Sequence, residues 1–207
     1  MLTQGYFEVA GLTDPDRPTW IYDLLARYEG LHVIAIGVDD IDLCYADLRS
    51  RAVDVPPPAS LYREIEINGK QHVAEFKHVR TNFEQYPHAR FVFVQHATPD
   101  LLWRPNLLSH RNGARSLQEV YLGTDQFLQA VSSLEQLFGI PPKIEDDVAE
   151  FQLARGSIKI LSSESLVKRY GDLNYPRFPS VVGCRFEVES VKETRQLLAG
   201  AGVKTQE

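Results

Sequence analysis

The sequence lacks the features that mark a secreted, membrane-bound or thiol-redox protein. Of its 207 residues only Cys44 and Cys184 are cysteines, and both lie within predicted elements, which favours core packing over a disulfide. No apolar run approaches membrane-spanning length. Residues 1–11, MLTQGYFEVAG, lack the basic start and long apolar core of a signal peptide. We therefore expect a cytoplasmic protein with no membrane partner.

Charge and short motifs argue against several further classes. The formal net charge is −6 and the basic residues are scattered, whereas nucleic-acid binding favours a basic stripe. The sequence contains no P-loop, no GxGxxG, no CxxC and no Ser-His-Asp spacing of catalytic type. Its 43% hydrophobic and 24% charged content is ordinary for a soluble globular protein. We expect no nucleic-acid partner.

One phrase of the sequence occurs three times. Residues 30–53, GLHVIAIGVDDIDLCYADLRSRAV, predict an apolar strand, an acidic turn, an amphipathic helix and a second apolar run. Residues 115–140 and 181–203 repeat this pattern in degraded form. Each predicted helix has two apolar residues seven positions apart: Ile41 and Leu48, Phe127 and Leu134, Val191 and Leu198. Such repetition predicts tandem copies of one structural unit.

The turn residues predict where the three helices begin. Asp39, Asp125 and Glu189 occupy matching positions, where an acidic side chain caps free N–H groups and opposes the helix dipole. Asn68-Gly69 lies between two alternating segments and predicts a hairpin. Residues 90–96, RFVFVQH, predict the strand that completes the first unit.

These signals divide the chain into five parts. We expect a complete βαβββ unit over 30–97, a connection over 98–114 and a second, shorter βαβββ unit over 115–162. Residues 1–29 would supply the last strand, over 4–12, and the connecting helix of an incomplete unit. Residues 163–207 would supply a link and the strand and helix of another. The predicted class is α+β, with curved sheets pairing into half-barrels, helices outside, and apparent truncation at both ends.

The units resemble the vicinal oxygen chelate superfamily, which includes glyoxalase I and extradiol dioxygenases, and more narrowly its glyoxalase-like domains. The segments that carry the resemblance are QGYFEVAG (4–11), EGLHVIAIGVDD (29–40), FVFVQHATPDLLWRP (91–105) and HRNGARSL (110–117). The resemblance covers nearly the whole chain. It is specific for the fold and says little about the reaction.

The resemblance implies a divalent metal ion, Zn, Ni, Mn or Fe, held by first and fourth strands of paired units. Carried over, the ligand positions are Glu8, His32 and either Gln95 or His96, which strand alternation places on opposite faces. The residues alone leave a second interpretation, in which His32 is a hydrogen-bonded strand histidine and Glu8 a half-exposed carboxylate.

The same mapping predicts that the second half of the chain binds no metal. The matching positions there are Gln118, Lys159 and Val182, of which the last two are poor ligands.

Several residues are predicted to contact a substrate. Tyr6, Phe93 and Gln95 would line a cavity, or simply fill the core. Trp103 and Arg104 lie in the long connection and would roof that cavity, with the guanidinium group holding a substrate carboxylate. Alternatively, Trp103 anchors the crossover between units.

Three functions follow from these residues. The first is a metal-dependent lyase, isomerase or dioxygenase-like enzyme on a small oxygenated substrate, in which Glu8 moves a proton as the catalytic residue. The alternative is a non-catalytic small-molecule binding protein of the resistance type, and the third is a mainly structural protein. An unpaired sheet edge at each terminus predicts a homodimer.

Overall fold

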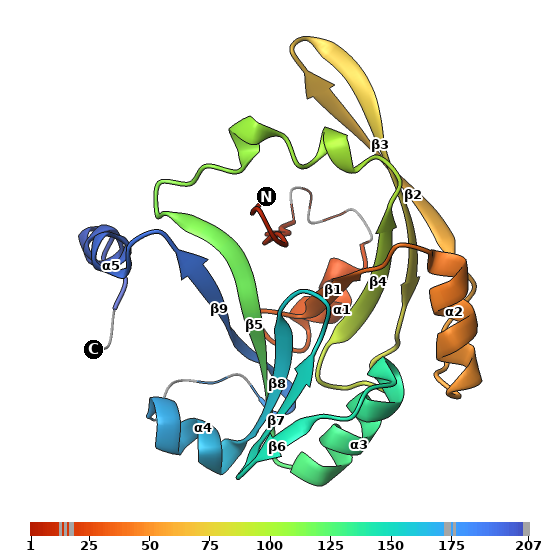
Figure 1. The fold of residues 1–207 in the computed structure, drawn as a ribbon, viewed down its shortest axis with the longest axis vertical. Helices are drawn as coiled ribbons and strands as arrows, with labels where there is room; N and C mark the ends of the chain where they lie inside the picture. The colour runs from red at the N-terminus through yellow and green to blue at the C-terminus, as the bar shows by residue number, and fades with distance from the viewer. Residues whose placement is uncertain (13, 15, 17–18, 172–174, 176, 205–207) are drawn as a thin grey trace.

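Two curved β-sheets and several short helices form this protein (Figure 1). The computed structural model describes residues 1–12, 14, 16, 19–171, 175 and 177–204. Each sheet is built around one strand–helix–three-strand unit, and neither closes into a barrel. The predicted α+β class and the tandem βαβββ units are confirmed. None of the helices in the described ranges is both long and apolar enough to cross a membrane.

The first sheet has the strand order β1-β4-β3-β2. Its elements are β1 (Val33–Gly37), α2 (Ile41–Ser50), β2 (Ala59–Ile67), β3 (Lys70–Arg80) and β4 (Arg90–His96). Strand β1 is parallel to β4, and the other pairs are antiparallel. Asn68 and Gly69 have φ of 53° and 75°, the left-handed geometry of a tight hairpin turn. The predicted hairpin is therefore present.

The second sheet has the order β6-β7-β8-β5-β9. Its unit consists of β5 (Ala114–Thr124), α3 (Phe127–Phe138), β6 (Lys143–Glu145), β7 (Val148–Gln152) and β8 (Ser157–Ser162). After α4 (Ser163–Tyr170), the third copy of the repeat supplies β9 (Ser180–Val188), antiparallel to β5, and α5 (Val191–Gly200). Short 3-10 turns at Pro99–Leu101 and Pro105–Leu107 lie in the connection between the sheets.

The segment 4–12 does not form the predicted strand. Only Gln4 pairs, in an isolated bridge with Ser116, and the residues after it are irregular and mostly exposed. The reason is long-range: from Glu119 onward β5 is hydrogen-bonded by β8 on one side and β9 on the other. The segment therefore finds no free edge along which to continue.

The helix caps also differ from prediction by one residue. The caps are Asp40, Gln126 and Ser190, not Asp39, Asp125 and Glu189. Asp40 has an extended backbone, and its carboxylate accepts hydrogen bonds from the N–H groups of Asp42 and Leu43, both at 2.9 Å. That geometry needs the residue directly before the first helical one.

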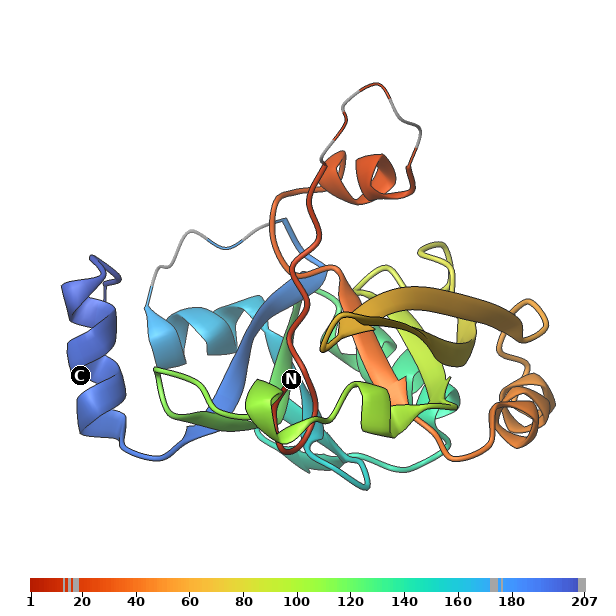
Figure 2. The ribbon, with the colours of Figure 1, turned by 90° about the horizontal axis from the view of Figure 1, so that it is seen from above.

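One hydrophobic core joins the two units. The repeat positions Ile41, Leu48 and Leu134 are fully buried in it. Phe138 bridges the units, because its ring lies 5.7 Å from that of Phe91 and 5.3 Å from that of Phe151. The third copy behaves differently: α5 buries no residue, and Val191 is 65% exposed. In all views α5 lies at the edge of the molecule (Figures 1 and 2).

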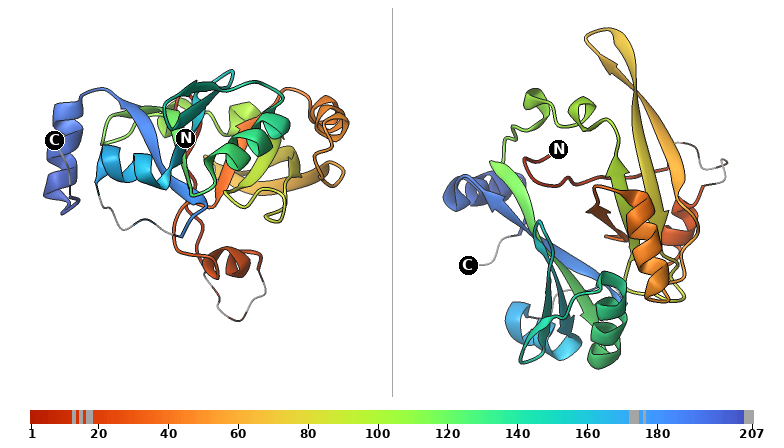
Figure 3. Two further views of the ribbon diagram at one scale, coloured as in Figure 1. Left: turned by 90° about the horizontal axis from the view of Figure 1, so that it is seen from below. Right: turned by 45° about the vertical axis from the view of Figure 1, so that its right-hand side comes forward.

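The first residues of the chain pack against the connection and the start of β5 (Figure 3). Thr3 N–H donates to the carbonyl of Arg115 at 2.8 Å, and Trp103 Nε1 donates to that of Leu2 at 3.1 Å. Further along, α1 (Ile21–Leu25) stands off the two sheets (Figure 2).

Candidate functional site

Strand β4 separates the predicted site residues onto two faces. Gln95 Oε1 accepts a hydrogen bond from Ile41 N–H at 3.2 Å, so this side chain faces the start of α2. Phe93 shares that face and is buried in the core. His96 therefore points to the opposite, concave face, the side on which Phe76 pairs with it. Phe93 and Gln95 face a helix and not the concave side of the sheet.

His32 lies on the same side as Gln95. It directly precedes β1 and continues the alternation of Ile34, which pairs with Phe91 of the core. Its Nε2 donates to the Tyr28 carbonyl at 2.8 Å, and its ring stacks on the Tyr28 ring at 4.1 Å. Burial lowers the pKa of His32, although the bond to Tyr28 opposes that shift. His32 and His96 thus occupy opposite faces of one sheet.

Three of the predicted residues do come together, in an aromatic cluster on the concave side. The His96 ring lies 4.9 Å from that of Trp103, 5.4 Å from Phe76 and 6.0 Å from Tyr6. Burial lowers the pKa of His96, and burial, with a smaller effect of Glu8, raises the pKa of Tyr6. Trp103 also holds Leu2, as expected for an anchor of the crossover.

The predicted metal ligands do not form a site in this structure. Glu8 lies exposed on the irregular N-terminal segment, and His32 uses its Nε2 on a backbone carbonyl. Within the described ranges, no group of three or more His, Cys, Asp or Glu residues could hold a metal ion. The residues present therefore do not fit the divalent ion that the resemblance implies. Arg104 lies in the connection, and its buried Nε has no hydrogen-bond partner in the part of the chain that the structure describes.

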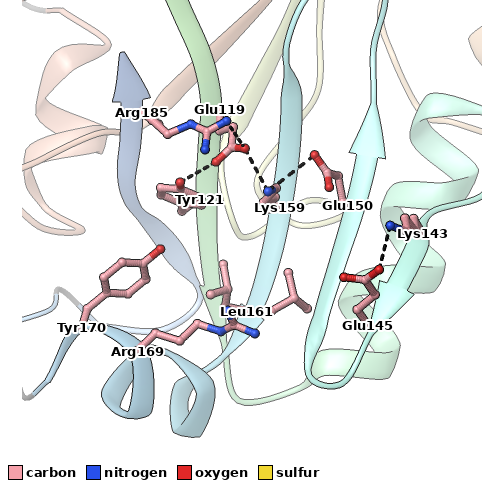
Figure 4. A pocket seen from close by; sticks show the side chains of 11 residues that line it. Glu119, Tyr121, Lys143, Glu145, Glu150, Lys159, Leu161, Arg169, Tyr170 and Arg185 are labelled. Carbon is pink, nitrogen blue, oxygen red and sulfur yellow. Dashed lines mark hydrogen bonds and ion pairs between the residues drawn. The ribbon is translucent and has the colours of Figure 1, made fainter. Parts of the chain in front are cut away.

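A pocket that the sequence did not predict lies on the concave face of the second sheet (Figure 4). At its base Glu119, only 5% exposed, projects from β5. Its carboxylate is 2.9 Å from Lys159 Nζ of β8 and 2.7 Å from a guanidinium nitrogen of Arg185 of β9. Tyr121 Oη donates to the same carboxylate at 2.5 Å, and Lys159 also lies 3.6 Å from Glu150. We call these five residues the Glu119 network.

The network affects the pKa values of Glu119 and Tyr121 in opposite directions. Burial by itself would raise the pKa of Glu119, but hydrogen bonds from Tyr121 and Lys159 and the nearby cations outweigh it and lower the pKa. Burial, together with the bond to Glu119, strongly raises the pKa of Tyr121. At neutral pH Glu119 is therefore ionised and Tyr121 protonated.

The pocket above this network measures about 250 Å³. Helix α4 closes one end, with Arg169 and Tyr170 (Figure 4). Eleven residues line the pocket: Glu119, Tyr121, Lys143, Glu145, Val148, Glu150, Lys159, Leu161, Arg169, Tyr170 and Arg185. Together they carry four cationic and three acidic side chains.

One sequence signal could have found this pocket. Lys159 is a cation between Ile158 and Ile160, in the middle of a strand whose other central residues are apolar. Glu119 and Tyr121 occupy alternate positions of β5 and so share a face. What the sequence does not show is that β5, β8 and β9 are neighbours, which the pairing of residues up to 74 positions apart decides.

The chain belongs to the glyoxalase-like domain family. The model of that family matches residues 1–138, which include the first sheet, β5 and α3. Nine of the eleven pocket residues lie beyond this range.

One solved structure supports the same fold. A hypothetical protein from Staphylococcus aureus superposes with a TM-score of 0.53 at 15% identity, covering 69% of this chain and 57% of that chain. The chain thus spans little more than half of that protein's length. A candidate glyoxalase from Bacillus halodurans is also similar at 15% identity, over 67% of this chain and 98% of its own, with a TM-score of 0.29. No curated protein matches the chain.

Proposed function

We propose that this glyoxalase-like domain binds a small organic acid in the pocket on its second sheet, as a non-catalytic binding protein. The observation that carries the proposal is the Glu119 network, a buried set of paired charges at the base of a pocket whose lining has one cation in excess. A monoanionic ligand would balance that charge.

The cations at the pocket mouth have capacity to bind such a ligand. The Arg185 side chain is 60% exposed and uses one guanidinium nitrogen on Glu119. Among the residues that the structure describes, Arg169 bonds only to the hydroxyl of Ser165, at 3.3 Å. A guanidinium group has five N–H donors in a planar fork that matches a carboxylate. Arg169 and Arg185 are thus suited to hold the ligand's acid group.

The size and apolar walls limit the rest of the ligand. Val148, Leu161 and Tyr170 supply apolar surface to the pocket. Sites for drug-sized molecules measure about 300–1,000 Å³. At about 250 Å³ this pocket fits an acid with a small carbon skeleton or a single ring.

The pKa shifts favour binding over proton transfer. A general acid or base works best when its pKa lies near the operating pH. The pKa of Glu119 is lowered and that of Tyr121 is raised, so both move away from neutrality. The metal-dependent enzyme predicted from the sequence would need Glu8, His32 and His96 to converge on one ion. The two histidines, however, lie on opposite faces of the first sheet.

Calorimetric titration with acetate, lactate and benzoate tests the proposal. We expect saturable binding of at least one acid, weakened tenfold or more by Arg185→Gln. Arg155→Gln, an exposed arginine in the β7–β8 turn, makes the same charge change outside the pocket and should leave the dissociation constant within twofold. Absence of saturable binding, or equal binding by both variants, would contradict the proposal.

Metal analysis tests the enzyme alternative. After loading with Zn, Ni, Mn or Fe, we expect no stoichiometric ion that depends on His96. A bound ion that is lost in His96→Ala would favour the metal-dependent enzyme instead.

A further inference from the structure

Three arginines gather at one end of the first sheet's concave face. Arg80 ends β3 and Arg90 begins β4, and both face the concave side because Arg80 pairs with Val92, two residues from Arg90. Arg27 follows α1 and reaches the same place from the N-terminal segment. We call these three residues the arginine cluster.

Aromatic rings hold two of the three guanidinium groups. The Cζ atom of Arg27 lies 4.1 Å from the centre of the Phe83 ring, and that of Arg90 lies 5.0 Å from the same centre. Arg90 also lies 5.8 Å from the ring of Trp20, which is 48% exposed. Cation–π contacts therefore place both guanidinium groups beside the Phe83 ring. The distance between their Cζ atoms cannot exceed the sum of these two distances from the ring centre.

The cluster lacks the carboxylates that accompany other arginines of this chain. Arg49, Arg51, Arg115 and Arg185 each form an ion pair. In the described part of the chain no carboxylate lies within ion-pair distance of Arg27, Arg80 or Arg90. Asp23 is the acidic residue whose charge acts on Arg90, and it does so from a longer distance.

Hydrogen-bonding capacity is also left over. Arg27 donates one N–H to the Pro87 carbonyl at 2.7 Å, which ties the β3–β4 loop to the N-terminal segment, while its buried Nε has no partner among the described residues. Burial lowers the pKa of Arg90, and the repulsion from Arg80 and Arg27 adds to the shift, offset in part by Asp23. An excess of positive charge is therefore concentrated at a place with unused N–H donors.

We propose that the arginine cluster binds the phosphate of an aromatic phosphate monoester, whose ring packs against Trp20. A phosphate monoester carries close to two negative charges at neutral pH and presents three acceptor oxygens to guanidinium groups. The half-exposed Trp20 ring beside Arg90 offers a flat apolar surface for an aromatic substituent. This site is separate from the Glu119 network, which lies on the other sheet and for which we propose a monoanionic ligand.

Titration of the whole chain with phenyl phosphate, followed by calorimetry and by NMR chemical shifts, tests this site. We expect saturable binding that Arg90→Gln and Arg80→Gln each weaken tenfold or more. Trp20→Ala should weaken phenyl phosphate binding but leave the dissociation constant for inorganic phosphate within twofold. Arg90→Lys keeps the charge and loses the planar guanidinium group, so its affinity for phenyl phosphate should lie between those of wild type and Arg90→Gln.

Matched controls separate this proposal from the previous one. Arg63→Gln changes the same charge on exposed β2 of the same sheet and should bind phenyl phosphate as wild type does. Arg185→Gln should weaken binding of the organic acid only, and Arg90→Gln should weaken binding of phenyl phosphate only. Because Arg80 is exposed, its variant should fold even if Arg90→Gln does not.

Two results would overturn the arginine cluster as a ligand site. One is the absence of saturable phenyl phosphate binding to the wild-type chain. The other is an equal change in the phenyl phosphate dissociation constant in Arg80→Gln and Arg63→Gln. In that case the arginine cluster would only stabilise the β3–β4 loop.

Discussion

On the second sheet Lys159 and Arg185 both reach the carboxylate of Glu119, whereas on the first sheet Arg80 and Arg90 lie together without such a partner among the described residues. Both concave faces belong to βαβββ units with the same strand order. The units share a backbone pattern because apolar residues on the helix side build the core. The concave side is free of that constraint, so each sheet carries its own charge pattern and, we propose, its own ligand.

Loss of Lys159 should give the largest effect on stability. Lys159→Met leaves the buried Glu119 with one cation fewer, and removing one partner of a buried ion pair costs about 3–5 kcal/mol in the free energy of unfolding. Urea unfolding measures the change. Lys143→Met, at an exposed ion pair on the same sheet, should change the urea midpoint far less, because solvent screens that pair. Similar losses in the two variants would show that the Glu119 network does not stabilise the second sheet.

A pH-dependent effect should follow from the first sheet. His88, in the β3–β4 loop, is 5% exposed, neither of its ring nitrogens bonds to a described residue, and burial lowers its pKa to about 4. The unfolded chain, with a histidine pKa near 6.5, binds this proton more readily below that pH. Stability should therefore fall as the pH drops from 6.5 towards 4, by up to about 3 kcal/mol from this group.

Replacing His88 tests that slope. His88→Phe should flatten the pH dependence of urea unfolding between pH 6.5 and 4, while His72→Gln, on the exposed hairpin, should preserve it. Glu119 of the second sheet should add to the pH dependence only at lower pH. Because its pKa is lowered in the folded chain, the stability that it contributes is lost as the pH falls below about 4.5. An unchanged slope in His88→Phe would assign the dependence to other groups.

Two glycines at the same repeat position should respond differently. A Cβ on Gly123 of β5 would lie 2.6 Å from Phe178 and 2.8 Å from Leu166, whereas one on Gly37 of β1 meets nothing within 4 Å. Gly123→Ala should lower the free energy of unfolding by about 1–3 kcal/mol, as expected for overpacking. Gly37→Ala should change it by less than about 0.5 kcal/mol. Thermal unfolding of both variants checks this, and equal shifts would contradict it.

The smallest effect should come from the arginine cluster. Arg90→Gln removes contacts with Phe83 and Trp20 worth about 0.5–1 kcal/mol each at exposed sites, and it also removes repulsion from Arg80 and Arg27. These terms oppose each other, so the free energy of unfolding should change by less than about 1 kcal/mol. Urea unfolding without phosphate measures it. A loss as large as that in Lys159→Met would mean that both faces use their cations for stability.

Much of the fold could be predicted from the repeat. The i, i+7 apolar pairs identified α2 and α3, whose positions Ile41, Leu48 and Leu134 are buried, and Asn68-Gly69 identified the β2–β3 hairpin. The same pattern identified α5, but there the Val191 position is exposed and the helix buries none of its residues. A periodic pattern shows which face is apolar but not whether anything covers it.

The candidate sites were less predictable. Tyr6, His96 and Trp103 do meet, as rings packed together, but Glu8 and His32 lie elsewhere. The difference arose because residues 4–12 alternate like a strand but had no edge to join. The Glu119 network was missed because its members are separated by up to 66 positions in the sequence.

The sequence by itself determined the units, the order of their helices and strands along the chain, and which residues of a strand share a face. These depend on local periodicity: two residues for a strand and 3.6 for a helix. The tertiary structure decided which edges were free, which strands became neighbours, and so which charges met. Those outcomes depend on hydrogen bonding between distant segments, such as β5 with β8 and β9, which local periodicity does not encode.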